Sequence, residues 1–223
     1  GFGWFLPVIG TRQWGGLLLT MVLAISGILC SFPLGVLLAI GRRSKLPVVS
    51  IFCTIFIEVV RGVPLVTVLF MFLIMLPLFV PGGESTDNII RAIVGFTIFT
   101  SAYIAENVRG GLQAIPRGQE EAAKAMGLNP FLTMVLIILP QALRIVIPAN
   151  VSQFVSLFKD TSLVAVAGGG MLELLGIGES VIGQSEFLGN YTEMALFIAT
   201  VYWFFAFSLT SVSKRLETAL GTG

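Results

Sequence analysis

The sequence of 223 residues is 56% hydrophobic and 11% charged, with a formal net charge of +1 and no histidine. Soluble domains carry about 25% charged residues. This composition therefore excludes an ordinary soluble protein, and the mean hydropathy of +0.96 agrees with burial in a bilayer. The small net charge gives no indication of a nucleic-acid partner, and the missing histidine removes the commonest metal ligand and general base.

Ahead of the first apolar run, residues 2–14 contain Trp4, Phe5 and Trp14, which suit the headgroup level of a membrane. We expect an interfacial helix on the outer face, with a disordered remnant as the alternative. The first apolar run is long enough to span a membrane and lacks a basic leader, so we expect no cleavable signal peptide.

Five stretches are apolar enough to cross a bilayer, which takes about 20 residues of helix. They cover residues 17–40, 46–80, 89–108, 131–158 and 191–213. The second is interrupted by the residues from Arg61 to Pro64, and the fourth contains Pro140 and Pro148. The sequence therefore predicts an all-α integral membrane protein with five transmembrane helices in a single domain over residues 1–223.

Basic residues predict the orientation of these spans, because they concentrate in short cytoplasmic loops. The basic side chains that follow the first, third and fifth spans are Arg42, Arg43, Lys45, Arg109, Arg117, Lys124, Lys214 and Arg215. The opposite side receives Glu84, Asp87, Glu173, Glu179 and Glu186. This bias places the N-terminus outside and the C-terminus in the cytoplasm.

Residues 159–190 are broken by several glycines, including the run 168–170. Their apolar pieces are too short to cross a bilayer. We expect short re-entrant or periplasmic helices there, and irregular backbone at such depth is tolerated only against protein or a water-filled cavity.

A short cytoplasmic helix is predicted over residues 116–127, between the third and fourth spans. Pro116 suits its first turn, Glu120 and Glu121 lie in the half that the helix dipole favours for acids, and Gly127 suits the left-handed position past its end. These helix-end signals alone are equally consistent with an ordinary capped helix that only connects two spans.

The residues Glu121-Ala122-Ala123, then Gly127, then Ile137, Leu139 and Pro140 stand at the spacings of the signature E-A-A, three residues, G, nine residues, I-x-L-P. In this the chain resembles the permease subunits of bacterial ABC importers. The resemblance implies that Glu120, Glu121, Ala122, Ala123 and Gly127 dock on an ATPase subunit and couple it to transport. Since no G-x-x-x-x-G-K-[ST] loop occurs in the sequence, we expect a permease that is not an enzyme and holds no cofactor, with ATP and Mg on the partner ATPase.

Three further segments, at residues 58–65, 102–112 and 159–163, are similar to motifs of polar amino-acid permeases of the histidine, glutamine and arginine type, and of general L-amino-acid permeases in particular. The resemblance implies a bacterial inner-membrane importer of polar L-amino acids that works by alternating access. It also implies a periplasmic solute-binding protein and a second permease subunit, with a homologous heterodimer favoured over a homodimer. Such subunits usually have additional residues before the first span, and at this end the sequence departs from the family pattern.

The candidate substrate pathway contains Glu58, Arg61, Gly62, Pro64, Asp160, Thr161 and Ser162. A break at Gly62 and Pro64 would leave a half-helix starting near Val63, whose N–H groups suit the α-carboxylate of an amino acid. Asp160 or Glu58 would hold the α-ammonium group. Two structural alternatives stay open: Glu58 and Arg61 neutralise each other at i,i+3, or Asp160 caps the next short helix.

Two other functions compete with this interpretation. A secondary transporter or channel driven by an ion gradient would explain Glu58 and Asp160 equally well, but not a capped helix with the importer spacing. A membrane scaffold without transport would explain neither the charges nor the broken spans.

Overall fold

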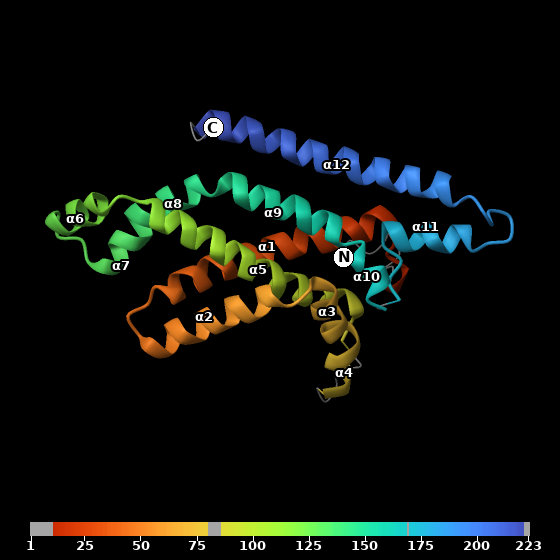
Figure 1. The fold of residues 1–223 in the computed structure, drawn as a ribbon, viewed down its shortest axis with the longest axis horizontal. Helices are drawn as coiled ribbons and strands as arrows, with labels where there is room; N and C mark the ends of the chain where they lie inside the picture. Colours follow the sequence, from red (N-terminus) through yellow and green to blue (C-terminus); the bar gives the residue numbers. More distant parts are fainter. Residues whose placement is uncertain (1–10, 80–85, 169, 221–223) are drawn as a thin grey trace, which may run out of the picture. The chain divides into compact units, whose positions relative to one another are not determined.

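The computed structural model describes residues 11–79, 86–168 and 170–220 and confirms the all-α membrane fold (Figure 1). Within these ranges, the one β feature is an isolated bridge between Gly16 and Glu173. Of the predicted N-terminal interfacial helix, only the end is described, as a short 3₁₀ turn η1 (Thr11–Gln13). Residues 2–10 of that prediction, together with Glu84 and Gly169, lie outside the described residues.

The helices follow one another with short connections. In chain order they are α1 (Gly16–Arg42), α2 (Pro47–Gly62), α3 (Leu65–Phe70), η2 (Met71–Met75), α4 (Leu76–Phe79), α5 (Asn88–Ala114), α6 (Arg117–Ala125), α7 (Pro130–Leu132), η4 (Thr133–Ile138), α8 (Leu139–Ile145), α9 (Ile147–Asp160), α10 (Leu163–Val166), α11 (Leu174–Ile182) and α12 (Tyr191–Leu220).

Three described helices, Gly16–Arg42, Asn88–Ala114 and Tyr191–Arg215, are individually long and apolar enough to span a bilayer. Two pairs, Pro47–Gly62 with Leu65–Phe79 and Pro130–Ile145 with Ile147–Asp160, pass the same test together, each bent by more than 40° at a break. The total reaches five if each bent pair is one span. Between the last two candidates, the helices formed by the described residues among 161–190 are the short α10 and α11.

Two prolines explain two stretches of π-helix. A proline inside a helix lacks the N–H that would bond four residues back, and its ring clashes with that carbonyl. η2 directly precedes the segment containing Pro77, and η4 directly precedes Pro140. The wider π turns absorb the missing bond, so the helices continue past both prolines.

The chain divides into two compact units. Unit 1 comprises residues 1–27, 64–96 and 157–204, and unit 2 comprises residues 28–63, 97–156 and 205–223. The buried core of unit 2 consists of Leu38, Ala39, Cys53, Ile57, Ile104, Ala105, Val108, Leu112, Ile138, Ala142 and Val146. In unit 1, the fully buried apolar side chains include Leu19, Leu23, Leu69, Phe96, Leu157, Phe158 and Val164.

Glycine lets helices within unit 2 approach closely, as is typical of membrane helices. A Cβ on Gly35 of α1 would lie 2.7 Å from the Cβ of Ile104 and 2.9 Å from the carbonyl oxygen of Ser101, both on α5. A Cβ on Gly111 of α5 would lie 2.7 Å from the carbonyl oxygen of Ala142 on α8. These contacts leave no room for a larger residue at either position.

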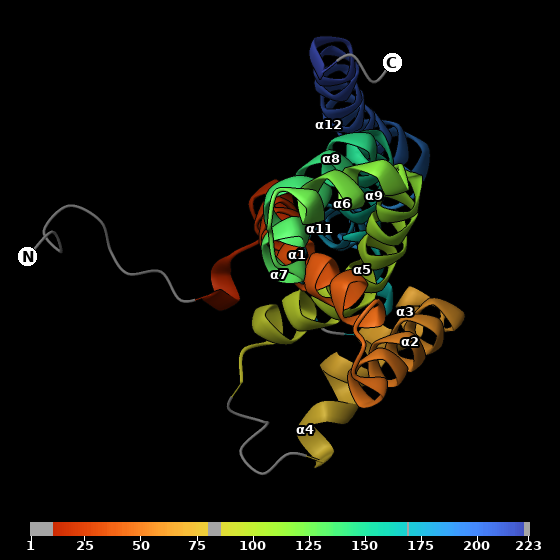
Figure 2. The same cartoon turned by 90° about the vertical axis from the view of Figure 1, so that its left-hand side faces the viewer.

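Within unit 2, the connection between α1 and α2 lies at the same end as α6 and α7 (Figures 1 and 2). This end gathers Arg43, Lys45, Arg117 and Lys124.

Candidate functional site

The helix α6 ends in a complete hydrogen-bonded cap. The N–H of Leu128 donates to the carbonyl oxygen of Ala123 at 3.1 Å, and the N–H of Gly127 donates to that of Lys124 at 2.9 Å. This is the Schellman pattern, whose residue after the helix adopts a left-handed conformation. Gly127 has φ of +80° there, as predicted. The helix runs over Arg117–Ala125, and Pro116 is the residue just before it rather than part of its first turn.

Most side chains of α6 are exposed rather than buried against the rest of unit 2. Ala123 is buried, whereas Glu120, Glu121 and Ala122 are exposed. Lys124 pairs with Glu120 at 2.8 Å, and the hydrogen bond from Lys124 lowers the pKa of Glu120 below its usual 4.5. A hydrogen bond of 3.3 Å from Gln141 of α8 to Gln119 ties the helix to its own unit. The geometry suits a small helix offered to a partner, and the docking role of its residues stays a prediction.

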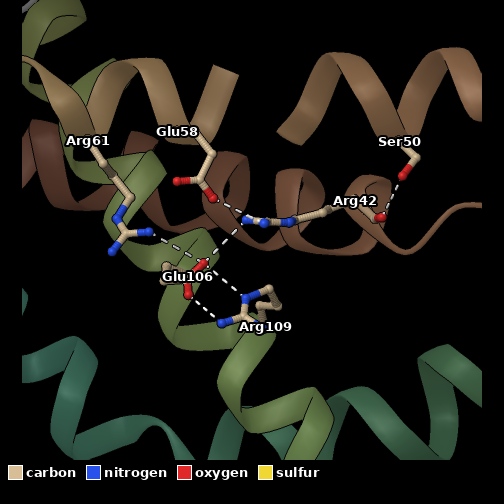
Figure 3. Close-up of polar contacts among 6 residues, drawn as sticks. All are labelled: Arg42, Ser50, Glu58, Arg61, Glu106 and Arg109. Atoms are coloured by element: carbon tan, nitrogen blue, oxygen red, sulfur yellow. Dashed lines mark hydrogen bonds and ion pairs between the residues drawn. The ribbon is translucent and has the colours of Figure 1, made fainter. Parts of the chain in front are cut away.

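A second cluster of charges lies in unit 2, where α1, α2 and α5 meet (Figure 3). Glu106 of α5 is at its centre. It accepts hydrogen bonds from Arg109 Nε at 3.0 Å and from Arg42 Nη1 at 3.4 Å, and it pairs with Arg61 Nη1 at 3.6 Å. Arg42 also bonds Glu58 at 3.1 Å. Three guanidinium groups and two carboxylates therefore leave one excess positive charge.

The suggested pairing of Glu58 with Arg61 is wrong. Glu58 pairs with Arg42, and Arg61 pairs with Glu106 (Figure 3). Arg61 also lies over the ring of Tyr103, with its guanidinium carbon 5.6 Å from the centroid, a cation–π distance.

The break in the second span falls where the sequence predicts it. α2 ends at Gly62, and Val63 and Pro64 are extended. The next helix starts at Leu65 rather than at Val63, because Pro64 is the residue just before it. Glu58, Arg61 and Gly62 belong to unit 2, whereas Pro64, Asp160, Thr161 and Ser162 belong to unit 1.

Asp160 ends α9 and does not cap the next helix, so that alternative is wrong. The residue just before α10 is Ser162, with no side-chain cap. The hydroxyls of Ser162 and Thr161 donate to the carbonyl oxygens of Lys159 at 2.9 Å and Phe158 at 2.7 Å. Thr161 is fully buried, while Asp160 is partly exposed.

Glu173, counted above among the outer charges, is fully buried in unit 1. Its carboxylate accepts the N–H groups of Leu175 and Gly176, both at 2.9 Å, and thereby caps α11. The hydroxyl of Tyr202 on α12 donates to it at 3.1 Å and lies 3.4 Å from the hydroxyl of Thr161. The network ties the candidate pathway residue Thr161 to α11 and α12.

The i,i+3 spacing of Glu106 and Arg109 near the predicted cytoplasmic end of the third span places them on one helix face, and the structure pairs them. Sequence reasoning did not identify Arg42, Glu173 and Tyr202 as members of these clusters. Glu173 carried no comparable signal, since glutamate is not a preferred N-cap residue.

Comparison with known proteins gives a consistent result. The model of the family described as "Binding-protein-dependent transport system inner membrane component" matches residues 31–221. YhdY of Escherichia coli (strain K12), described as an inner membrane amino-acid ABC transporter permease protein, is 50% identical over 218 residues, which are 98% of this chain and 59% of YhdY. BztC of Rhodobacter capsulatus, described as a glutamate/glutamine/aspartate/asparagine transport system permease protein, is 45% identical over 216 residues, 96% of this chain and 49% of BztC. The chain thus spans about half the length of these two relatives.

The fold also matches a solved structure described as the crystal structure of an amino acid ABC transporter with histidines. The TM-score is 0.78 at 26% identity, and the match covers 92% of this chain and 92% of that one.

Proposed function

Because the chain belongs to the family of binding-protein-dependent transport system inner membrane components, we propose that it is the permease subunit of an importer that moves polar L-amino acids into the cell by alternating access. The substrate class is supported by the descriptions of YhdY and BztC, which name amino acids. The family match gives no support to the ion-gradient alternative.

The observation that carries this proposal is the helix α6, which is exposed on most sides apart from the buried Ala123 and has a hydrogen-bonded C-terminal cap. Its E-A-A residues lie on a rigid helix of nine residues that ends at the left-handed Gly127. Met126, the residue between the helix and Gly127, is 82% exposed and would be available to a partner. We propose that Glu120, Glu121, Ala122, Ala123 and Gly127 dock on a separate ABC ATPase, which binds ATP and Mg, and that this chain holds no cofactor.

The ATPase partner is tested with the reconstituted complex. Glu121→Lys combined with Gly127→Pro reverses a charge on the docking face and removes the left-handed cap. ATP hydrolysis should then no longer respond to substrate and binding protein, while the variant still inserts into the membrane. Glu186→Lys, an equal charge reversal at an exposed position in unit 1, is the matched control. Unchanged coupling in the α6 variant would contradict the docking role.

The charge cluster of unit 2 supports a pathway for zwitterions. Its excess positive charge is suited to a carboxylate, and the half-helix that begins at Leu65 offers N–H groups for the same purpose. We propose that Glu58, Arg61, Gly62, Pro64, Asp160, Thr161 and Ser162 line this pathway, with Asp160 as an acceptor for the ammonium group. Asp160→Asn should raise the substrate concentration needed for half-maximal uptake without releasing the ATPase, and normal uptake kinetics would remove Asp160 from the pathway.

The remaining partners follow from the small number of spans. At most five candidate spans in the described ranges are few to enclose a path, so we propose a second permease subunit, with a homologous heterodimer favoured and a homodimer possible. A periplasmic solute-binding protein would deliver the substrate to a multi-pass subunit in the bacterial inner membrane. The basic residues that follow alternate spans support an outside N-terminus and a cytoplasmic C-terminus.

A further inference from the structure

A groove of about 700 Å³ runs along one flank of α6 in unit 2. It is lined by Arg43 and Lys45 from the α1–α2 connection, by Arg117, Glu120, Glu121 and Lys124 of α6, and by apolar side chains including Leu112, Ile115, Met134 and Ile138. Its volume lies within the range of about 300–1,000 Å³ that is usual for small-molecule sites. Glu120 and Glu121 belong to the proposed docking residues, whereas Arg43, Lys45 and Arg117 have no role in the docking proposal.

The charges of the groove favour an anion. Four basic side chains face two carboxylates, and Lys124 and Glu120 neutralise each other at 2.8 Å. Arg43 donates a hydrogen bond to the carbonyl oxygen of Leu112 at 3.3 Å. Because this oxygen is uncharged, the contact does not neutralise the positive charge of Arg43. Within the described part of the chain, neither Lys45 nor Arg117 makes a hydrogen bond or an ion pair. Setting Glu121 against Arg43, Lys45 and Arg117 leaves two positive charges.

The apolar side chains on one wall of the groove indicate that the anion also has a hydrocarbon part. Leu112 and Ile138 are 3% and 6% exposed and belong to the core of unit 2. Thr133 also lines the groove and is buried, and its hydroxyl has no hydrogen-bond partner among the described residues. Such a group is expected to find an acceptor when a ligand or water is present. Cations beside an apolar wall suit a ligand with a charged head and a hydrocarbon part.

The position in the chain agrees with such a ligand. Arg43 and Lys45 directly follow the end of α1, and Leu112 lies in the last turn of α5, so the groove is at the end of two candidate spans. Basic pockets at the cytoplasmic ends of spans bind anionic lipid headgroups. We infer that this groove binds the headgroup of an anionic phospholipid of the cytoplasmic leaflet, with its acyl chains towards Met134 and Ile138. The inference rests on the orientation given under the proposed function.

The test is carried out on the permease in complex with its ATPase. The double variant Lys45→Gln/Arg117→Gln removes two charges without breaking a contact inside the described chain. Lys214→Gln/Arg215→Gln, which removes two exposed charges from α12, is the matched control. Native mass spectrometry counts the phosphatidylglycerol retained from vesicles of phosphatidylcholine mixed with phosphatidylglycerol. Retention should fall roughly tenfold or more in the groove variant, since each basic side chain near an anionic surface contributes about a fivefold factor. It should fall clearly less in the control, whose two charges lie outside this groove.

Equal retention in the two variants would overturn the inference. So would release of the ATPase by the groove variant with lipid retention unchanged, because the groove would then belong to the ATPase interface. Displacement of the lipid by inorganic phosphate at millimolar concentration would assign the groove to a free anion and also overturn it. Lipid retention is measured without substrate. Its result therefore does not depend on whether the protein transports amino acids, and the two proposals can fail separately.

Discussion

The carboxylate of Glu106 on α5 lies 3.4 Å from Nη1 of Arg42 on α1, although 64 residues separate them in the chain. The same carboxylate pairs with Arg61 of α2, so one acidic side chain joins three helices of unit 2. Charges at such a position are costly unless they are paired. Glu106 therefore sets the stability of the whole cluster.

Glu106→Gln should lower the stability of the protein. The change leaves three guanidinium groups opposed only by Glu58, and breaking a largely buried pair costs about 3–5 kcal/mol. Because the Glu106 side chain is 24% exposed, we expect a smaller loss of ~2 kcal/mol. Thermal unfolding in detergent would show a fall of several degrees, against no change for the exposed Glu186→Gln. An equal melting temperature for both variants would contradict the central role of Glu106.

Gly35→Ala should destabilise the contact between α1 and α5. The added Cβ would lie 2.7 Å from the Cβ of Ile104 and 2.9 Å from a backbone oxygen, and overpacking of this kind costs about 1–3 kcal/mol. Gly110→Ala on α5 is the matched control, since nothing lies within 4 Å of its added Cβ and glycine to alanine inside a helix stabilises by roughly 0.5–1 kcal/mol. The melting temperatures of the two variants should shift in opposite directions. A stable Gly35→Ala protein would show that the helices can separate there without penalty.

Among the features that the sequence predicted correctly are helix ends and breaks, which depend on residues close together in the chain. The cap of α6 at Gly127 and the break after Gly62 depend on residues next to one another in the chain, and both predictions are confirmed. The partners of Glu58 and Arg61 depend on which helices meet. The i,i+3 spacing rule applies only to residues of one helix. It therefore suggested that these two residues pair with each other. The charge bias places Glu173 among the outer charges but does not predict that it is buried, because its partner Tyr202 comes from another helix.

The ion pair of Glu120 and Lys124 should make α6 sensitive to acid. Lys124 lowers the folded-state pKa of Glu120 below 4.5, so the stabilisation is complete above about pH 4.5 and is lost as the pH falls through the lowered value. Both side chains are about half exposed, and the effect is therefore small. The protection factor of the α6 amides, which is the intrinsic exchange rate at each pH divided by the observed rate, should fall on acidification more in the wild type than in Glu120→Gln. Identical pH profiles would mean that the pair does not stabilise the helix.

Tyr202→Phe should lower the stability of unit 1. The tyrosine hydroxyl donates to the buried carboxylate of Glu173 at 3.1 Å, and a hydrogen bond to a charged group contributes about 1.5–3 kcal/mol. Tyr191→Phe, which removes an exposed hydroxyl from the same helix, should have no effect on the melting temperature.

Glu173→Gln should cost more than Tyr202→Phe, because an amide cannot accept from Leu175, Gly176 and Tyr202 as a carboxylate does. In the double variant the two losses should not add, since each change removes the same bond, and a coupling of about 0.5–3 kcal/mol is expected. Additive losses would mean that the Tyr202 hydroxyl stabilises unit 1 through its contact with the hydroxyl of Thr161 rather than through Glu173.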